Sequence, residues 1–247
     1  MSILLVTGSG TGAGKTITAA AIAACAIAAG RSVAVVKPVQ TGVASDEPAD
    51  IDDVRRLSGA EDVHEYARFT EPLAPATAAR RMGQAGPSID GMVELIISLA
   101  DRDLVIVEGA GGALVQFNEQ GHTILDLGIA LTGQLTAQEP PRLLLATSCA
   151  LGTLHATAAT AQVVRAAGLA VDHLVITDWP TSGIELANRC NLEDLPIYAQ
   201  APLDGVLANG LGLLSQVDFG DSALDMLAPR LGGTLDTTQF TRLNAHA

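Results

Sequence analysis

Short apolar runs alternate with longer alanine-rich or amphipathic stretches along the chain. Five of these runs are mostly Val, Leu and Ile, which predicts strands buried on both faces of a sheet: 3–6, 32–37, 104–107, 142–148 and 173–178. Residues 195–202 are predicted as a sixth strand. The remainder, 205–247, shows weak periodicity, and its tail from about residue 230 is expected to be poorly ordered or peripheral.

The stretches between the strands carry helical signals. Helices are predicted at 16–29, 54–57, 88–99, 154–167 and 184–191, with one more in the alanine-rich stretch after "EPLAP". Strand–helix alternation of this length predicts one α/β domain over 1–247, with a mostly parallel central sheet and helices on both faces.

Composition narrows the classes of partner. Apolar residues make up 48% of the chain, aromatic residues only 3%, and the formal net charge is -13. Such a charge argues against nucleic acid and anionic membranes as partners, although a local site can still bind phosphate. Cys25, Cys149 and Cys190 have neither disulfide nor zinc spacing. With no signal-peptide pattern and no membrane-spanning apolar run, the protein is expected to be soluble and cytoplasmic.

Ligands of open α/β sheets bind beyond the carboxyl ends of the strands, so the loops there hold the candidate chemistry. The first is "GSGTGAGKT" at 8–16, between a strand and a helix. Its backbone N–H groups can surround phosphate oxygens, Lys15 can reach the outer phosphates, and the Thr16 hydroxyl can bind Mg²⁺. The common motif has glycine where this chain has Ser9, so the loop is one residue longer. A merely flexible turn is the weaker alternative.

A second lysine, Lys37, ends the strand in "VVKPVQTGV", and Pro38 keeps it extended. The residue type alone fits a solvated strand end as well as a functional group. Its position favours function, because it leaves the sheet at the same edge as the loop that carries Lys15. Two ammonium groups converging there would stabilise the charge on a transferring phosphoryl group.

Two carboxylates are candidate ligands of Mg²⁺. Glu108 ends the strand in "VIVEGAGG", where an acid often binds the metal in phosphate-loop enzymes, although it could be an ordinary strand-terminal acid. Asp50 lies in an acidic loop, and its composition indicates that the loop is solvated. Spacing alone cannot single out one of its acidic residues. In "ATSCALGTLHAT", the N–H groups near 152–155 could hold an anion. Equally, this segment could be an ordinary connection between a strand and a helix.

Several separate motifs together resemble the dethiobiotin synthetase family. In order they are "VTGSGTGAGKT", "VKPVQTG", "PLAPATAA", "LVIVEGAGGALV" and "LGTLHAT", within residues 1–205. The resemblance implies a phosphate-loop NTPase-like fold and a Mg²⁺-dependent ligase of biotin synthesis. It implies that 7,8-diaminononanoate, CO₂ and ATP react through a carbamate and a carbamoyl-phosphate to close a ureido ring. It also implies a homodimer with the substrate near the subunit interface.

The resemblance also implies roles for individual residues. Lys37 and Lys15 match catalytic lysines, and Thr16, Asp50 and Glu108 match the Mg²⁺ ligands, with a less secure alignment at Asp50. The substrate positions are Thr41, Gly152, Thr153 and Leu154, the last three at a helix start that receives the substrate carboxylate from the partner subunit. The nucleotide-binding positions are Gly12, Ala13, Gly14, Lys15, Thr16, Ile17, Asp50, Glu108, Gly109, Ala110, Gly111, Thr177 and Asp178.

Two departures from the family pattern affect these expectations. His155-Ala156 replaces a common Asn-His pair, which leaves the role of His155 open. Thr177-Asp178 replaces a pair whose amide reads adenine, so we expect weak base selection and use of other nucleoside triphosphates. The main alternative is a partitioning-type ATPase switch, but that class carries a second lysine in the loop, where this chain has Gly10. An amidotransferase-type ligase would need a longer chain.

Overall fold

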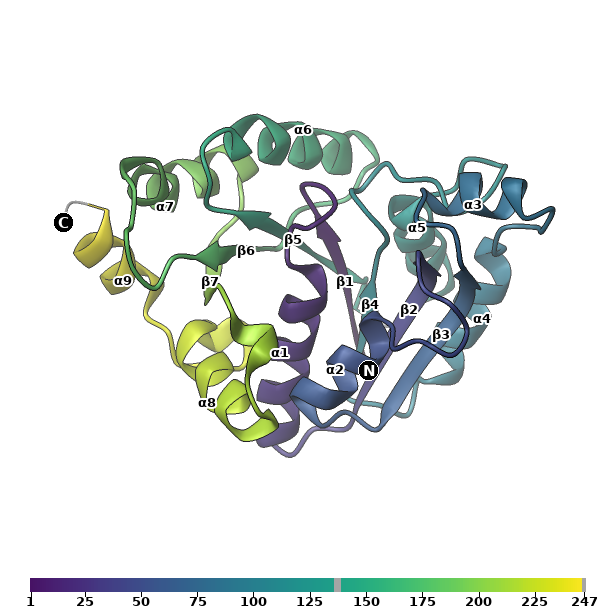
Figure 1. Ribbon diagram of the computed structural model, residues 1–247, viewed down its shortest axis with the longest axis horizontal. Coiled ribbons are helices and arrows are strands. Elements are labelled where there is room, and N and C mark those ends of the chain that lie inside the picture. The colour runs from purple at the N-terminus through teal and green to yellow at the C-terminus, as the bar shows by residue number, and fades with distance from the viewer. Residues whose placement is uncertain (136–138, 246–247) are drawn as a thin grey trace.

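A seven-stranded sheet forms the centre of the computed structural model, which describes residues 1–135 and 139–245. The strands are β1 (Ser2–Gly8), β2 (Val33–Thr41), β3 (Asp62–Phe69), β4 (Leu104–Glu108), β5 (Arg142–Ser148), β6 (His173–Trp179) and β7 (Leu203–Ala208). All neighbouring strands pair in parallel, in the order β3-β2-β4-β1-β5-β6-β7. The predicted fold class is therefore confirmed, and β1 with the phosphate loop lies in the middle of the sheet (Figure 1).

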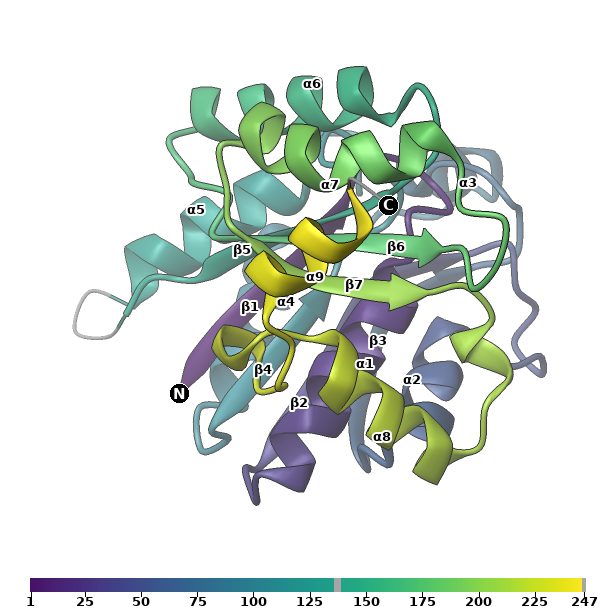
Figure 2. The ribbon, with the colours of Figure 1, turned by 90° about the vertical axis from the view of Figure 1, so that its left-hand side faces the viewer.

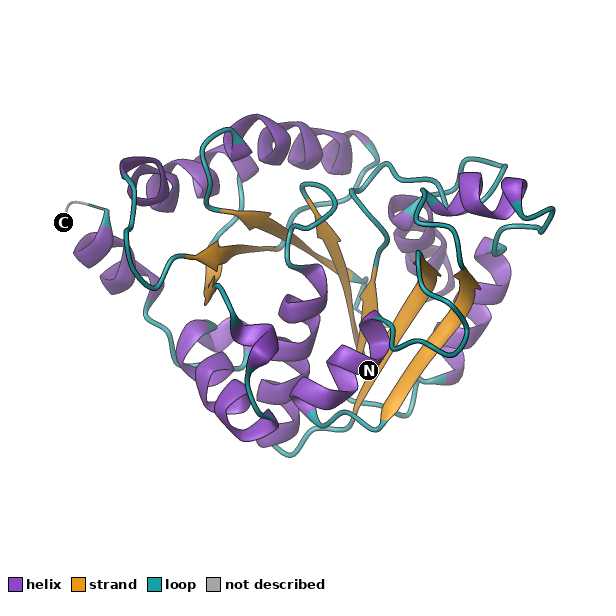
Figure 3. Cartoon of the chain, in the orientation of Figure 1, coloured by secondary structure: helices purple, strands orange, loops and turns teal. Residues whose placement is uncertain are grey.

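Helices cover both faces of this sheet (Figure 3). One face carries α1 (Lys15–Ala28), α2 (Asp50–Ser58) and α8 (Gln216–Met226), which pack on one another. The opposite layer contains α4 (Ile89–Ser98), α5 (Ile124–Gln134), α6 (Thr153–Ala166) and α7 (Leu186–Ala199). The remaining helices are α3 (Pro75–Arg81), α9 (Thr237–Asn244) and two short 3₁₀ turns, Leu211–Leu213 and Pro229–Leu231.

The apolar runs are continuous because each central strand contributes to two cores. In β1, Ile3 and Leu5 pack into the core under α4–α7, whereas Leu4 and Val6 pack into the core under α1, α2 and α8. All four side chains are at most 5% exposed. Alternation along a strand thus places every residue of such a run in an apolar layer, as in other parallel sheets.

Strand β3 was not predicted from the sequence, because it does not have an apolar run. It is an edge strand with mostly half-buried residues, and its sequence DVHEYARF mixes charged and apolar side chains. Strand β2 extends past Pro38 to Thr41, further than predicted. The proline falls where pairing with β4 has ended, since that pairing runs only as far as Val36.

The predicted sixth strand at 195–202 is wrong. Residues 195–199 form the end of α7, whose buried positions recur with helical spacing: Asn188, Asn191, Leu192, Leu195 and Ala199. The helix continues through Pro196 to Ala199, and Gln200 after it has a left-handed backbone. The next strand, β7, begins at Leu203.

The C-terminal segment includes α9, which lies beside α7 and β7 (Figure 2). None of the residues of α9 is buried, but the ring of Phe240 packs edge-to-face against Trp179, with centroids 5.7 Å apart. Among the described residues, no helix combines the length and the apolar character that crossing a membrane would require.

Candidate active site

The phosphate loop connects the end of β1 to the start of α1. Gly12 and Gly14 have φ angles of 76° and 71°, a left-handed conformation that glycine adopts without the steric cost of a Cβ. The Lys15 ammonium donates to the Gly10 carbonyl oxygen at 3.3 Å, so the lysine folds back over the loop. Helix α1 begins directly after this loop, at Lys15. Its free N–H groups therefore lie at the loop, which is the arrangement that binds phosphate.

Thr177, near the end of β6, packs against the phosphate loop. Its hydroxyl lies 3.2 Å from the Ala13 carbonyl oxygen and 3.3 Å from that of Thr147. A Cβ at Gly14 would stand 2.7 Å from the Thr177 methyl carbon. Thr177 is 2% exposed, and its hydroxyl is occupied by backbone oxygens. The structure thus places Thr177 against the loop, whereas the neighbouring Asp178 is exposed with a φ of 55°.

Lys37 lies at the centre of a cluster of oxygen atoms. Its Nζ is 2.6 Å from Oδ2 of Asp50 and 2.7 Å from Oε1 of Glu108. The same Glu108 oxygen accepts a hydrogen bond from the Thr16 hydroxyl at 2.8 Å. Lys37 and Glu108 meet because β2 and β4 pair in register up to Val36 and Val107, so the next residues lie side by side. The structure brings together four candidates from four different segments of the chain.

Burial and charge oppose each other at the two lysines. Burial is the largest influence on Lys37 and favours its neutral form, but the carboxylates of Glu108 and Asp50 together outweigh it and raise the pKa of Lys37. For Lys15, burial again comes first and lowers its pKa, and the attraction of Glu108 does not compensate. Lys37 is therefore held as an ammonium ion within the cluster.

One cavity of about 830 Å³ contains the loop and the cluster. Its lining includes Lys15, Thr16, Ile17, Lys37, Thr41, Asp50, Glu108, Ala110 and Gly111 among the predicted residues. A cavity of this volume is large enough for a nucleotide and a second small substrate. Gly109 lies behind this lining and donates its N–H to the Val6 carbonyl oxygen at 2.9 Å.

Sequence reasoning missed part of the cavity wall. Pro72, Leu73, Ala74, Pro75 and Val115 line one side and give it an apolar character. Gln40 also lines the cavity, and its side-chain oxygen accepts the Asp50 N–H at 3.3 Å, which fixes the start of α2 beside Lys37. The "PLAP" segment was a usable signal, since two prolines beside apolar residues form a rigid surface.

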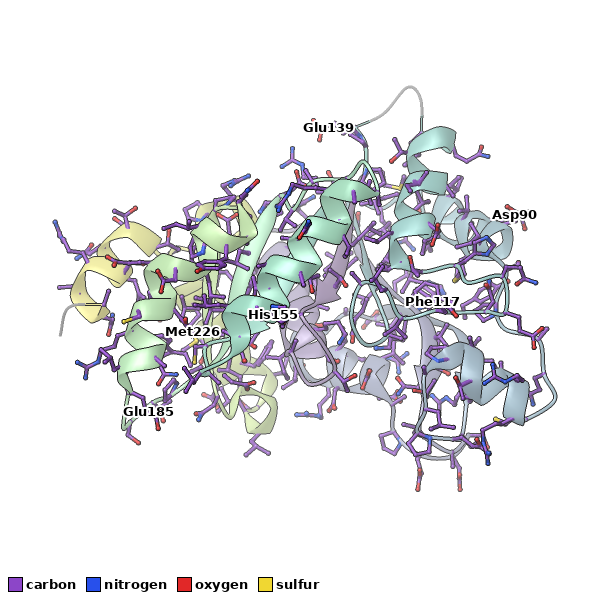
Figure 4. The ribbon with its side chains drawn as sticks, turned by 90° about the horizontal axis from the view of Figure 1, so that it is seen from above. Asp90, Phe117, Glu139, His155, Glu185 and Met226 are labelled. Atoms are coloured by element: carbon purple, nitrogen blue, oxygen red, sulfur yellow. The ribbon has the colours of Figure 1, made fainter. Side chains whose placement is uncertain are left out.

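The start of α6 does not line this cavity. Gly152 is its N-cap with a φ of 94°, and the Thr153 hydroxyl lies 2.7 Å from that of Thr147. Thr153 is buried, Leu154 is partly buried, and His155 is exposed in the first turn of the helix (Figure 4). The substrate residues predicted here are thus separate from Thr41, which does line the cavity.

The oxygen cluster is chemically suited to Mg²⁺. No group of three or more His, Cys, Asp or Glu side chains that could hold a metal is found in residues 1–135 and 139–245. Magnesium does not need such a group, since it is commonly bound by one or two carboxylates together with water and substrate phosphates. Asp50 and Glu108 both contact the Lys37 ammonium, and the Thr16 hydroxyl contacts the same Glu108 oxygen, so three hard oxygen donors lie together and fit the ion.

Solved structures with a similar fold have low sequence identity to this chain. The signal recognition particle receptor FtsY from Elizabethkingia anophelis in complex with GDP has a TM-score of 0.53 at 21% identity, covering 90% of this chain. FtsY from Mycoplasma mycoides has a TM-score of 0.57 at 14% identity, covering 100%. The chain spans 63% of the first structure and 68% of the second, and the likeness concerns the fold.

Sequence comparison gives much closer relatives. A family profile described as an AAA domain matches residues 2–209. The ATP-dependent dethiobiotin synthetase BioD of Streptomyces avermitilis is 49% identical over 241 residues, 97% of this chain and 98% of the relative. The protein of the same name from Mycobacterium avium is 42% identical over 223 residues, 89% and 92% of the two chains. With this identity over nearly its full length, the chain belongs to the dethiobiotin synthetase family.

Proposed function

We propose that the protein is an ATP-dependent ligase that forms the ureido ring of dethiobiotin from 7,8-diaminononanoate, CO₂ and ATP. The observation that carries this proposal is the meeting of Lys37, Asp50, Glu108 and Thr16 beside the phosphate loop, in a cavity that also has an apolar wall. The charged end suits carbamate and phosphate, and the wall formed by 72–75 suits a hydrocarbon chain.

The reaction uses three molecules and proceeds in three steps. One amine of the substrate adds to CO₂ and loses a proton, which gives a carbamate. A carbamate oxygen attacks the γ-phosphorus and ADP leaves, so that a carbamoyl-phosphate forms. The second amine then attacks the carbamoyl carbon, the C–O bond to phosphate breaks, and the ring closes with loss of a proton. Negative charge gathers on carbamate and phosphate together.

The two lysines stabilise different parts of this negative charge. Lys15, folded over the loop, faces the nucleotide phosphates. Lys37 enters from β2 on the side of Thr41 and holds the carbamate and the γ-phosphate at once. Fixed, buried cations stabilise a charged transition state because they need no reorganisation. Mg²⁺, bound by Thr16, Asp50 and Glu108, would supply further charge neutralisation on the phosphates.

The substrate carboxylate is held at the start of α6 of a second subunit. This assignment rests on the family resemblance and on the separation of Gly152 from the reacting end of the cavity. Free N–H groups at a helix start suit a carboxylate. Leu151 and Leu114 are 88% and 62% exposed in the loops after β5 and β4, and they supply apolar surface for a dimer contact.

Purified protein is expected to convert 7,8-diaminononanoate, bicarbonate and Mg²⁺·ATP into dethiobiotin, with one phosphate released for each ring closed. Mass spectrometry measures the product and a colorimetric assay measures the phosphate. Omission of the diamine is the control, because a ligase releases little phosphate without its acceptor. Phosphate release that is independent of the diamine, with no dethiobiotin, would instead support the ATPase-switch alternative.

Base selection is expected to be weak. The Thr177 hydroxyl is bonded to backbone oxygens under the loop, so it supplies no donor–acceptor pair to a base. We expect kcat/KM values for ATP and CTP within about 100-fold of each other, roughly 2.7 kcal/mol. Steady-state assays with ATP, CTP and GTP measure the ratio. A preference for ATP above that limit would contradict this expectation and point to base recognition by another segment.

A further inference from the structure

The ammonium of Lys37 occupies the position that a metal ion bound by the same carboxylates would take. Nζ of Lys37 lies between Oδ2 of Asp50 and Oε1 of Glu108, at 2.6 and 2.7 Å. These are two of the three donors that fit Mg²⁺, and the third, the Thr16 hydroxyl, donates its hydrogen to the same Glu108 oxygen. A cation bound directly by these oxygens at about 2.1 Å would stand where the ammonium now stands.

Charge reinforces this steric conflict. Two carboxylates share the single positive charge of this ammonium, and the side chains of Lys37 and Glu108 are only 4% and 2% exposed, so water screens that pair little. Two cations cannot share one buried oxygen at contact distance without strong repulsion. The Thr16 hydroxyl needs no rearrangement, because it can donate its hydrogen to Glu108 while a lone pair faces a metal. Metal entry therefore requires the lysine to leave.

We propose that Lys37 is an internal cation that holds the metal site closed until the metal–nucleotide complex displaces it, and that this displacement delivers the ammonium to the second substrate. The inference rests on the proposed function, in which Lys37 acts on the carbamate. It adds a sequence of events: the lysine is tied to Asp50 and Glu108 while the metal is absent, and becomes available for catalysis only when metal has loaded. The nucleotide favours the exchange because its phosphates bring negative charge that offsets the added cation.

The composition of the chain makes this proposal directly testable. The sequence contains two lysines, Lys15 and Lys37. Lys15 bonds to a loop carbonyl, whereas Lys37 bonds to the carboxylates, so each lysine serves as the control for the other. Mn²⁺ is a suitable probe because it binds the same oxygen ligands as Mg²⁺ and is followed by electron paramagnetic resonance.

The first experiment measures Mn²⁺ binding without nucleotide to the wild type, Lys37→Met and Lys15→Met. Both variants lose one positive charge near the carboxylates, but only Lys37→Met frees the oxygens themselves. We expect Lys37→Met to bind Mn²⁺ about tenfold or more tightly than the wild type, and Lys15→Met to change affinity by less than about threefold. Equal tightening in the two variants, or none in Lys37→Met, would overturn the proposal.

A second experiment uses the wild type and decides the question if Lys37→Met does not fold. Lysine labelled with ¹³C and ¹⁵N gives two ammonium resonances, assigned with Lys15→Met. A non-hydrolysable ATP analogue with EDTA should shift the Lys15 resonance, and later Mg²⁺ should shift that of Lys37. A Lys37 resonance that moves fully before Mg²⁺, or never moves, would refute the exchange. Neither experiment contains diaminononanoate, so failure of the substrate assignment would be recognised separately.

Discussion

Lys37→Gln is expected to lower kcat for dethiobiotin formation by at least about 10³-fold, because it removes the cation that faces carbamate and γ-phosphate together. Glutamine keeps hydrogen-bonding capacity but carries no charge, and it leaves Asp50 and Glu108 without their buried partner. The measurement is a single-turnover assay at saturating Mg²⁺, ATP and diamine, which separates the chemical step from binding.

Two controls distinguish lost catalysis from lost structure. Circular dichroism and thermal unfolding show whether Lys37→Gln still folds, and Glu108→Gln shows what the loss of one carboxylate from the same cluster does to the fold. Arg31→Gln changes an exposed cation that bonds to the Asp103 carbonyl oxygen, outside the cavity, and should retain near-normal turnover. If Lys37→Gln folds and has a normal kcat, Lys37 does not take part in the chemical step.

The strand-end residues show how much of the site the sequence can predict. A parallel sheet aligns the carboxyl ends of its strands, so Lys15, Lys37 and Glu108 could be placed at one edge from their positions after apolar runs. The order of the strands in the sheet determines which of these side chains are in contact. Lys37 meets Glu108 because β2 lies directly beside β4, a non-sequential pairing that local patterns do not encode.

Asp50 illustrates a limit of reasoning from composition. Its segment reads as a solvated acidic loop, and nothing in the spacing separates Asp50 from Asp52 or Asp53. The structure separates them by helix geometry. Asp50 is the first residue of α2 and faces Lys37, while Asp52 accepts the Ala49 N–H and Asp53 pairs with Arg56. The choice of residue depends on where the helix begins, which is the least predictable property of a helix.

Three of the elements that were missed have two different physical causes. Strand β3 is half-buried at a sheet edge, and the C-terminal half of α7 contains Pro196, so both contradict the local rules for strands and helices. Helix α5 follows a glycine-rich loop that hides its start, although Thr123 and Asp126 form a capping box there. For β3 and α7 tertiary packing outweighs local propensity, whereas the start of α5 carries a local signal that agrees with the structure.

Gly14→Ala is expected to weaken ATP binding by about 100-fold or more, roughly 2.7 kcal/mol, through a displaced phosphate loop. Gly14 has a φ of 71°, which strains any residue with a Cβ. The new methyl would also stand 2.7 Å from the Thr177 Cγ2 atom and 2.9 Å from its hydroxyl oxygen. Thr177 cannot retreat easily, because it is buried between the loop and the Thr147 carbonyl oxygen. The N–H groups that should surround phosphate must move instead.

Gly10→Ala is the matched control in the same loop. Its φ is outside the left-handed region and a Cβ there would meet nothing within 4 Å, so ATP affinity should stay within about threefold of the wild type. Isothermal titration with Mg²⁺ and a non-hydrolysable ATP analogue measures all variants. Combining Gly14→Ala with Thr177→Gly removes all three clashing atoms of Thr177 but not the backbone strain, and should restore part of the affinity. Unchanged binding by Gly14→Ala alone would mean that this loop does not hold the phosphates, because a loop displaced at Gly14 could not keep their contacts.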